Sequence, residues 1–299
     1  MVEKKVLALV VTYNRRDLLR RCLLALRAQT VRPDHVLVVE NAGSDGTLGM
    51  LTEEFPEVEV IHHETNRGGA GGWESGIRRA QEGSWDFVWL MDDDAWATPE
   101  ALERLVEAFS AIQPTPAFVC SRVVDDQGAT VNFPHPDLED GSPGGWDRYL
   151  TSGRVPLKAC SFVSVLIPLA NTRKVGLPLG HYFLWSDDYE YTLRLGACGT
   201  GWYVATSLVA HPRPGGLPNP DLALEPNESR LPLYRHLFRN YAETMARHPR
   251  HHPHWILSSL RLFFSTAARL ISHRRASRLP LLAKSTAVGI WRGLRVPRA

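Results

Sequence analysis

Cysteine is scarce in this chain of 299 residues, and the four cysteines lie far apart. Their positions, which are Cys22, Cys120, Cys160 and Cys198, form none of the close pairs that bind zinc or exchange disulfides. This spacing argues against a zinc module, a thioredoxin-like redox site and a disulfide-stapled scaffold. We therefore expect reduced and mostly buried thiols, as is usual in cytosolic proteins.

Long hydrophobic runs are also missing. The sequence contains no stretch of about 18 uncharged apolar residues, so we expect no transmembrane helix. The apolar run that follows Met1–Lys5 is too short for a signal peptide, and no cleavage pattern comes after it. A chain of this length can bury a full core, so one large domain with a smaller appendage is the natural expectation.

Acidic residues are absent from the last part of the chain. Residues 244–299 hold eleven Lys or Arg and no Asp or Glu, whereas the whole chain has a net charge of only +2. Within this tail, Trp255–Ile271 is apolar and aromatic, with Arg261 and Arg269 on one polar stripe. The pattern predicts either a helix in an anionic membrane interface or a helical subdomain that packs or dimerises. Nucleic-acid binding is disfavoured because no recognised module accompanies the charge.

The N-terminal part alternates apolar strands with amphipathic helices. The first run, Val6–Thr12, is continuously apolar, which is typical of a strand covered on both faces. The predicted strands are 6–12, 36–39, 58–61, 87–91 and 118–124, and the predicted helices are 15–29, 47–54, 73–81 and 99–112. Strands that alternate with helices indicate βαβ units, so the predicted class is α/β with a mostly parallel sheet flanked by helices.

Polar residues follow three of these strands. Thr12 ends the first strand and Asn14 follows it, Glu40 comes directly after the second, and Asp92-Asp93-Asp94 follows the fourth. Ligands bind at the carboxyl ends of the strands in such sheets. Each segment alone is more typical of a turn, but three of them on one edge indicate a binding site.

The aspartate triplet has a specific chemical implication. Three adjacent carboxylates repel one another and raise each other's pKa unless a cation lies among them. Alternate residues of an extended segment share a face, so Asp92 and Asp94 can hold one hard metal ion together. The alternative is an acidic turn before a helix that starts near Thr98-Pro99-Glu100.

A glycine-rich segment, Asn66–Gly72, precedes the helix that we expect to start at Trp73. Glycines let backbone N–H groups approach a phosphate, and Arg67 supplies positive charge. The segment matches neither the P-loop pattern nor Gly-x-Gly-x-x-Gly, so a flexible loop is the alternative. Its position just before the aspartate strand favours a ligand role for Arg67, Gly68 and Gly69.

A second acidic cluster lies within Phe183–Tyr191. Asp187 can cap the helix that begins here, whereas Asp188 can project into a cleft as a base. His211 stands before a proline and is more typical of a surface loop; as a metal ligand it needs the fold to return it to the acidic edge. Residues 125–157 are rich in Gly, Pro and Asp and predict a long loop or hairpin.

Taken in order, five of these segments resemble family 2 glycosyltransferases, which have the GT-A fold. The segments lie within residues 5–215 and read Val-Thr-Tyr-Asn-Arg (11–15), Glu-Asn-Ala-Gly-Ser-Asp-Gly-Thr (40–47), Asn-Arg-Gly-Gly-Ala-Gly-Gly (66–72), Met-Asp-Asp-Asp (91–94) and Trp-Ser-Asp-Asp-Tyr-Glu-Tyr (185–191). The glycine run and the second acidic cluster are most similar to the galactofuranosyltransferase branch, and rhamnosyltransferases share similar glycine runs.

The resemblance implies an inverting transfer from a nucleotide-diphosphate sugar to an acceptor hydroxyl. Asp92, Asp94 and His211 match the family's ligands for Mg²⁺ or Mn²⁺. Asp188 matches the general base, and Asp187 matches its supporting neighbour. The positions that match donor contacts are Thr12, Asn14, Glu40, Arg67, Gly68, Gly69, Asp92 and Asp93. One departure is that many members have Asp where this chain has Glu40.

The expected reaction moves galactofuranose from UDP-galactofuranose onto a glycan or polyprenyl-linked acceptor in cell-surface polysaccharide synthesis. The alternatives are a rhamnosyltransferase that uses dTDP-rhamnose, a sugar nucleotidyltransferase and an inactive carbohydrate-binding relative. A nucleotidyltransferase would need a lysine-rich nucleotide loop near the N-terminus, and binding alone needs no base. We expect residues 1–225 to form the catalytic domain and 226–299 a helical basic region, on the cytoplasmic face of the cell membrane, with homo-oligomerisation left open.

Overall fold

The computed structural model describes residues 4–132, 134–137, 146–212 and 220–296. The chain forms two compact units, one made of Met1–His181 with Asp188–Pro214 and the other of Tyr182–Asp187 with Gly215–Ala299. Part of the loop predicted at 125–157 lies outside the described residues. The assignment of 1–225 and 226–299 to two functional domains stays a prediction.

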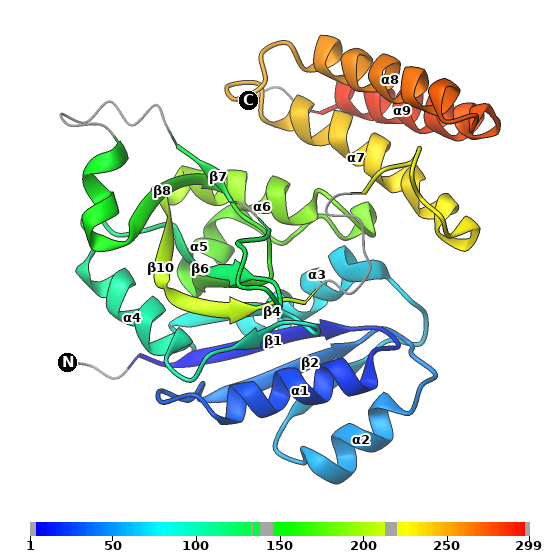
Figure 1. Cartoon of the computed structure of the whole chain (residues 1–299). Helices are drawn as coiled ribbons and strands as arrows, with labels where there is room; N and C mark the ends of the chain where they lie inside the picture. The colour runs from blue at the N-terminus through cyan, green and yellow to red at the C-terminus, as the bar shows by residue number, and fades with distance from the viewer. Residues whose placement is uncertain (1–3, 133, 138–145, 213–219, 297–299) are drawn as a thin grey trace. The chain divides into compact units, whose positions relative to one another are not determined.

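One mixed sheet flanked by helices forms the centre of the first unit (Figure 1). Within the described ranges it has ten strands in the order β3-β2-β1-β4-β9-β6-β10-β8-β7, with β5 paired to β10. The strands are β1 (Val6–Thr12), β2 (His35–Glu40), β3 (Glu59–His62), β4 (Phe87–Asp92), β5 (Trp96–Ala97), β6 (Phe118–Val124), β7 (His135–Pro136), β8 (Arg154–Ala159), β9 (Ser164–Pro168) and β10 (Gly201–Ala210). The helices of this unit are α1 (Arg16–Arg27), α2 (Thr47–Glu54), α3 (Gly68–Gln81), α4 (Ala101–Ala111), α5 (Leu169–Val175) and α6, whose range Asp187–Leu195 starts with one residue of the other unit.

The predicted α/β class is confirmed, and the parallel character is strongest in the N-terminal half. β3, β2, β1 and β4 run parallel to one another, as βαβ units require. Beyond β4 the sheet is mixed, because β9 runs antiparallel to both β4 and β6. β10 is parallel to β6 and antiparallel to β8. An apolar run of five residues does not show strand direction, so the sequence could not reveal this change.

Alternate residues of β1 enter two different cores, which explains its continuous apolar run. Ala8 and Val10 pack in the core that includes residues of α1, α2 and α4. Leu7 and Leu9 pack in the core that includes residues of α3, α5 and α6. All four side chains are at most 1% exposed. A central strand covered on both faces therefore accounts for the absence of polar alternation.

Helix α3 begins at Gly68, so the expected start at Trp73 is wrong and most of the glycine run is helical. Glycine disfavours a helix in isolation, and the close packing of α3 on β1 offsets that cost. A Cβ atom on Gly72 would lie 2.4 Å from Val11 Cγ1, and one on Gly76 would lie 2.4 Å from Leu9 Cδ1. A larger residue at either position would push the helix away from the strand, so these glycines serve packing rather than flexibility.

The second unit contains α7 (Tyr234–Arg247), α8 (Trp255–Ser272) and α9 (Leu279–Leu294). Its core includes Phe238 of α7, Leu270 of α8 and Leu282 of α9. α7 and α9 approach closely at Gly289, where a Cβ atom would lie 2.6 Å from the carbonyl oxygen of Arg239. In the part of the chain that the structure describes, none of the helices combines the length and apolar content needed to cross a bilayer.

Candidate active site

The fold returns His211 to the aspartates at the end of β4. β10 ends at Ala210, and its last residues pair antiparallel with β5, which lies just after the triplet: Val209 pairs with Ala97 and Ala210 with Trp96. One ligand atom each from Asp92, Asp94 and His211 lies within 4.8 Å of the others. Two carboxylate oxygens and one imidazole nitrogen suit Mn²⁺ and are tolerable for Mg²⁺. The required juxtaposition is present, and the ligand roles of these residues stay a prediction.

Two side-chain oxygens lie next to the ring nitrogens of His211. Nε2 lies 3.0 Å from Oδ1 of Asp94, and Nδ1 lies 3.0 Å from Oδ1 of Asn132. A proton on Nδ1 that is donated to the Asn132 oxygen leaves Nε2 to act as a ligand, which is the usual arrangement at protein metal sites. Asn132 was not among the predicted residues, because no local signal links it to a histidine 79 positions away.

The electrostatics of the triplet favour a cation. Burial and the neighbouring charge of Asp94 raise the pKa of Asp92 to about 7, against the opposing effect of His211. Burial also raises the pKa of Asp93 to about 6, although Arg15 opposes it. The pKa of Asp94 is lowered despite burial, because His211 and Arg15 stabilise its ionised form. The raised pKa values of Asp92 and Asp93 show that the three carboxylates do not ionise together easily. Such a cluster fits a site in which a divalent ion supplies the missing positive charge.

Arg15 is the main site residue that the sequence reading missed. Its Nη1 donates to Oδ1 of Asp93 at 3.0 Å and to Oδ2 of Asp94 at 2.5 Å. The other oxygen of Asp93 accepts a hydrogen bond from Thr12 Oγ1 at 2.7 Å. Thr12 and Asp93 therefore contact each other within the chain, and their predicted contact with a donor stays a prediction. Arg15 is the last residue of the motif Val-Thr-Tyr-Asn-Arg (11–15), and this position is the one sequence signal that could have identified it.

Asn14 and Glu40 shape the turn after β2. Asn14 has φ of 51°, and its Oδ1 accepts from the N–H of Ser44 at 2.7 Å. Glu40 is fully buried; one oxygen accepts from the N–H of Gly43 at 2.5 Å, and the other lies 2.7 Å from Nδ1 of His62. Both oxygens of Glu40 thus have partners in the chain. The half-exposed His62 is a further residue at this edge that the sequence reading did not single out.

Arg67 lies at the start of α3, directly before Gly68 and Gly69. The guanidinium donates to Ser75 Oγ at 2.9 Å and to Glu74 Oε2 at 3.3 Å, and its side chain is 47% exposed. Gly68 has φ of 70°, a conformation that favours glycine. A half-exposed cation beside a helix N-terminus is compatible with an anionic ligand.

Asp188 belongs to α6, on the sheet face that α3 also covers. Phe162 packs edge-on against both Trp73 of α3 and Tyr191 of α6. Burial raises the pKa of Asp188 to about 6, although the N–H of Tyr189 donates to its Oδ1 at 2.7 Å. A carboxylate with a pKa near neutrality is suited to accept a proton. Asp187 is buried and opens the same helix.

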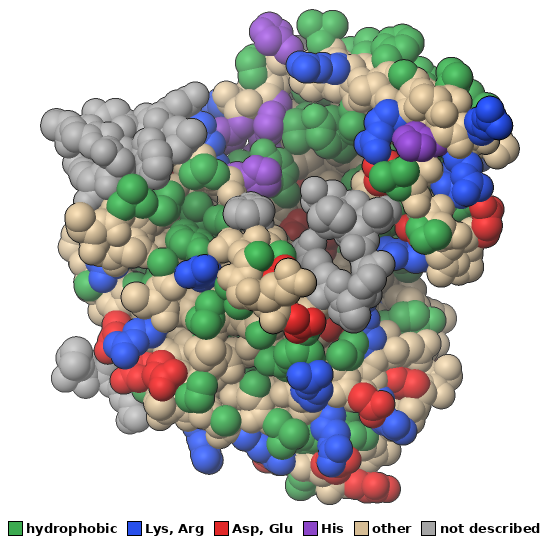
Figure 2. Space-filling model, in the orientation of Figure 1, with side chains coloured by type: hydrophobic (Ala, Val, Ile, Leu, Met, Phe, Trp, Pro, Cys, Tyr) green, Lys and Arg blue, Asp and Glu red, His purple; other side chains and the backbone are tan. Residues whose placement is uncertain are grey.

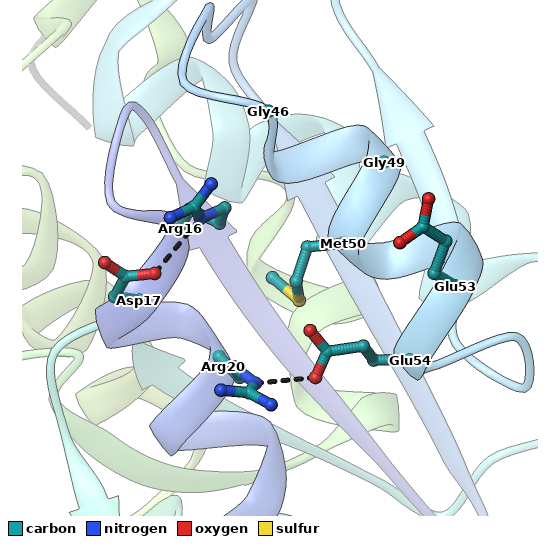
Figure 3. A pocket seen from close by; sticks show the side chains of 8 residues that line it. All are labelled: Arg16, Asp17, Arg20, Gly46, Gly49, Met50, Glu53 and Glu54. Atoms are coloured by element: carbon teal, nitrogen blue, oxygen red, sulfur yellow. Dashed lines mark hydrogen bonds and ion pairs between the residues drawn. The ribbon is translucent and has the colours of Figure 1, made fainter.

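A separate hollow of about 310 Å³ lies between α1 and α2 (Figure 3). Two ion pairs among its lining residues join Arg16 with Asp17 and Arg20 with Glu54. They neutralise most of the charged side chains in the hollow. Its lining residues are Arg16, Asp17, Arg20, Gly46, Gly49, Met50, Glu53 and Glu54. None of the predicted site residues is among them, so we assign it no part in the chemistry.

The amino-acid sequence of the chain is similar to those of known proteins. Residues 8–162 match the family model described as "Glycosyl transferase family 2". The galactofuranosyltransferase GlfT1 of Mycobacterium tuberculosis is 32% identical over 205 residues, which cover 64% of this chain and 64% of that protein. The undecaprenyl-phosphate mannosyltransferase of Micrococcus luteus is 35% identical over 133 residues, or 44% of this chain and 53% of that protein. The chain thus matches less than two thirds of the length of either relative.

A solved structure supports the GT-A fold. The mannosyltransferase PcManGT from Pyrobaculum calidifontis, in complex with GDP-Man and Mn²⁺, aligns with a TM-score of 0.57 at 16% identity over 98% of this chain and 83% of that chain. At this identity the likeness concerns the fold alone. With more than half of the sequence matched to the family model and the expected fold observed, the chain belongs to glycosyl transferase family 2.

Proposed function

We propose that this protein is an inverting, metal-dependent glycosyltransferase that uses a nucleotide-diphosphate sugar. The observation that carries the proposal is the convergence of Asp92, Asp94 and His211 within 4.8 Å at the carboxyl end of β4. That is the edge at which ligands bind in sheets of this kind. The family membership and the Mn²⁺ in the related mannosyltransferase structure support the proposal.

The proposed donor is UDP-galactofuranose, and the acceptor is a glycan or polyprenyl-linked hydroxyl. The similarity to the galactofuranosyltransferase GlfT1 over 205 residues supports this choice. The second candidate is mannose transfer to a polyprenyl phosphate, which the shorter match to the undecaprenyl-phosphate mannosyltransferase favours. Transfer of rhamnose from dTDP-rhamnose remains a third reading because of the glycine run at 66–72.

On the leaving-group side, the side chains of Asp92, Asp94 and His211 would hold Mg²⁺ or Mn²⁺. A bound divalent ion supplies Lewis-acid stabilisation to the charge that grows on the departing diphosphate. Asn132 keeps Nε2 of His211 available. Arg15 fixes Asp93 and Asp94 through its two hydrogen bonds, so the carboxylates are oriented before a donor arrives. Arg67 is the half-exposed cation proposed to meet the diphosphate.

On the acceptor side, Asp188 is the proposed general base. The acceptor hydroxyl must lose its proton as its oxygen attacks the anomeric carbon, and a carboxylate can take that proton. A pKa of about 6 leaves Asp188 mostly ionised at neutral pH and yet basic enough to act. One displacement with one base inverts the anomeric configuration. Asp187 is proposed to support Asp188 from the same helix turn.

We also propose that the second unit binds an anionic membrane surface. Leu257, Phe264 and Ile271 recur every seven residues along α8 and are 65%, 65% and 63% exposed. Seven residues make about two helical turns, so the three side chains form one apolar stripe. Figure 2 shows exposed hydrophobic side chains over this unit with basic ones among them. Residues 244–299 carry no acidic residue that would repel anionic lipids.

A donor screen tests the proposed reaction. The protein is incubated with Mn²⁺ or Mg²⁺ and each of UDP-galactofuranose, UDP-galactopyranose, dTDP-rhamnose and GDP-mannose, and nucleotide diphosphate release is measured with and without a polyprenyl-linked glycan. We expect metal-dependent UDP release from UDP-galactofuranose that increases with acceptor. Release of GDP alone would favour the mannosyl candidate, and no release from any donor would contradict the proposal.

A further inference from the structure

The backbone directly before α6 has an unusual conformation. In the segment Tyr182–Ser186, residues Phe183, Trp185 and Ser186 have φ of 65°, 65° and 66°. This left-handed region is unfavourable for residues with a β-carbon, and most of all for bulky ones. Three such residues within one short segment persist only where the surrounding structure holds them.

The side chain of Asn240 on α7 holds this segment through its backbone. Nδ2 of Asn240 donates to the carbonyl oxygens of Tyr182 at 3.0 Å, Leu184 at 3.0 Å and Trp185 at 2.8 Å. The amide has two N–H groups, so the three acceptors share them. Asn240 is 0% exposed, which means that bulk water cannot easily replace these bonds. Without this amide, three carbonyl groups would lose a buried donor.

Other residues of α7 hold the side chains of the same segment. The hydroxyl of Tyr182 forms a hydrogen bond with a residue of α7, and the rings of Phe183 and Trp185 pack on aromatic rings of α7. The pairs are Tyr182 with Thr244 at 3.0 Å between hydroxyls, Phe183 with His236 at 4.8 Å between ring centroids, and Trp185 with Tyr234 at 5.2 Å. Arg239 adds a hydrogen bond to the Tyr182 carbonyl at 3.0 Å. α7 thus constrains this segment at both the backbone and the side chains.

We propose that Asn240 is a positioning residue for the general base Asp188. The chain runs from the strained segment straight into α6, whose first two residues are Asp187 and Asp188. The conformation at 183–186 is therefore continuous with the start of the helix that carries Asp188. A base must lie within hydrogen-bond reach of the acceptor hydroxyl, so a small displacement lowers turnover more than donor binding. This inference rests on the proposed role of Asp188.

The first test substitutes Asn240→Ala in the full chain. We expect kcat to fall about tenfold or more, while KM for the nucleotide sugar stays within about threefold. Hydrogen–deuterium exchange measured by mass spectrometry, without donor, should show faster exchange in peptides covering 182–195. Peptides covering 87–97 should exchange as in the wild type. Asn171→Ala is the matched control, because it removes a half-buried amide whose Nδ2 donates to the Ala117 carbonyl at 3.0 Å.

Ser186 provides a second test that leaves the Asn240 hydrogen bonds in place. Ser186→Val disfavours the left-handed conformation, since a β-branched residue tolerates it worst, and we expect the same selective fall in kcat. Ser186→Gly removes the steric penalty, so in the Asn240→Ala background it should restore part of the lost kcat. If Asn240 only stabilised the fold, Ser186→Gly would raise the folded fraction and leave kcat per folded molecule unchanged.

The two readouts separate this inference from the proposed function. Unchanged exchange over 182–195 in Asn240→Ala would overturn the positioning role whatever the activity. A folded Asn240→Ala with wild-type kcat, or an equal loss in Asn171→Ala, would also overturn it. Should Asn240→Ala fail to fold, a wild-type kcat in Ser186→Val would overturn it as well. Suppose that Asn240→Ala shows faster exchange over 182–195 but the wild-type protein turns over no donor. That result would support the contacts of Asn240 with this segment and refute the proposed function.

Discussion

Arg15 donates a hydrogen bond to Asp93 at 3.0 Å and so places a positive charge inside the acidic triplet. The same guanidinium lies 2.5 Å from Asp94, one of the proposed metal ligands. It therefore orients two carboxylates and also competes with an incoming cation for one of them. By orienting the carboxylates, Arg15 stabilises the metal-free protein, whereas by competing with the cation it weakens metal binding. The two effects can therefore be measured separately.

Arg15→Gln should lower the stability of the metal-free protein and strengthen Mn²⁺ binding. Because the Arg15 side chain is 48% exposed, we expect the loss of stability to stay below about 1 kcal/mol. Affinity for Mn²⁺ should rise by up to about fivefold. Thermal shift measurements in EDTA and across a Mn²⁺ titration check both. Arg20→Gln, which breaks the Arg20–Glu54 ion pair on α1 and α2, should leave Mn²⁺ binding unchanged; weaker binding in Arg15→Gln would contradict the competition.

Asp92→Asn should stabilise the metal-free protein and abolish its response to Mn²⁺. The folded pKa of Asp92 is about 7, above its ordinary value of 3.8, so the folded state binds the proton more tightly than the unfolded state. Its contribution to stability is therefore present at low pH and lost as pH rises toward and through 7. At pH 8 we expect Asn to raise the free energy of unfolding by about 1 kcal/mol or more.

Urea unfolding in EDTA at pH 8 and at pH 5 measures the effect of Asp92→Asn, which should be smaller at pH 5. The control Asp17→Asn changes a carboxylate whose side chain is 81% exposed and should have little effect at either pH. A variant that is destabilised in EDTA and retains the Mn²⁺-induced thermal shift would show that Asp92 does not hold the ion.

Asp188→Asn should abolish transfer and leave donor binding largely intact. The expected loss in kcat is about 10² to 10⁴, the usual contribution of a general base. In the wild type, kcat/KM should fall about tenfold per pH unit below about pH 6, because protonation of Asp188 removes the acceptor for the hydroxyl proton. Turnover by Asp188→Asn at the wild-type rate, or a flat profile between pH 7 and pH 5, would refute this assignment.

Local patterns were enough to predict five of the ten strands in the described ranges and much of the acidic edge. β1, α2 and β6 have the predicted ranges, because continuous apolar runs and a polar turn before a helix are local signals. The juxtaposition of Asp92, Asp94 and His211 was harder to predict, because His211 and Asp94 are 117 positions apart in the sequence. Only the motif order suggested their proximity, and the pairing of β10 with β5 is what produces it.

The contacts that the sequence could not predict depend on tertiary approach. Arg15 meets Asp93 across 78 positions, and no local pattern marks an arginine as the partner of a distant carboxylate. The early start of α3 has a similar cause, since a glycine run in isolation favours a loop, whereas here Gly72 and Gly76 let the helix pack closely on β1. The left-handed conformations of Phe183, Trp185 and Ser186 likewise have no local signal, because Asn240, which donates to the carbonyl of Trp185, is 55 positions away in the sequence.

Gly72→Ala should destabilise the protein, since its Cβ atom would lie 2.4 Å from Val11 Cγ1. Overpacking at such a site costs about 1 to 3 kcal/mol. The matched control is Gly49→Ala on α2, where a Cβ atom meets nothing within 4 Å and alanine favours the helix. Urea unfolding should show the first variant less stable and the second slightly more stable. A neutral Gly72→Ala with weakened donor binding would instead favour a ligand role for this glycine.

Membrane binding by the second unit should require both anionic lipid and the apolar stripe of α8. In flotation assays, we expect the protein to rise with vesicles that contain phosphatidylglycerol at low salt, and to rise less at high salt because ionic screening weakens the attraction of its basic residues. Replacing Leu257, Phe264 and Ile271 together with Ser should abolish flotation, because the inserted area is lost. Leu24→Ser with Val31→Ser, at exposed positions of the first unit, is the matched control and should float like the wild type. Flotation of the triple variant would contradict insertion of α8, and a protein that stays down with anionic vesicles at low salt would contradict membrane binding altogether.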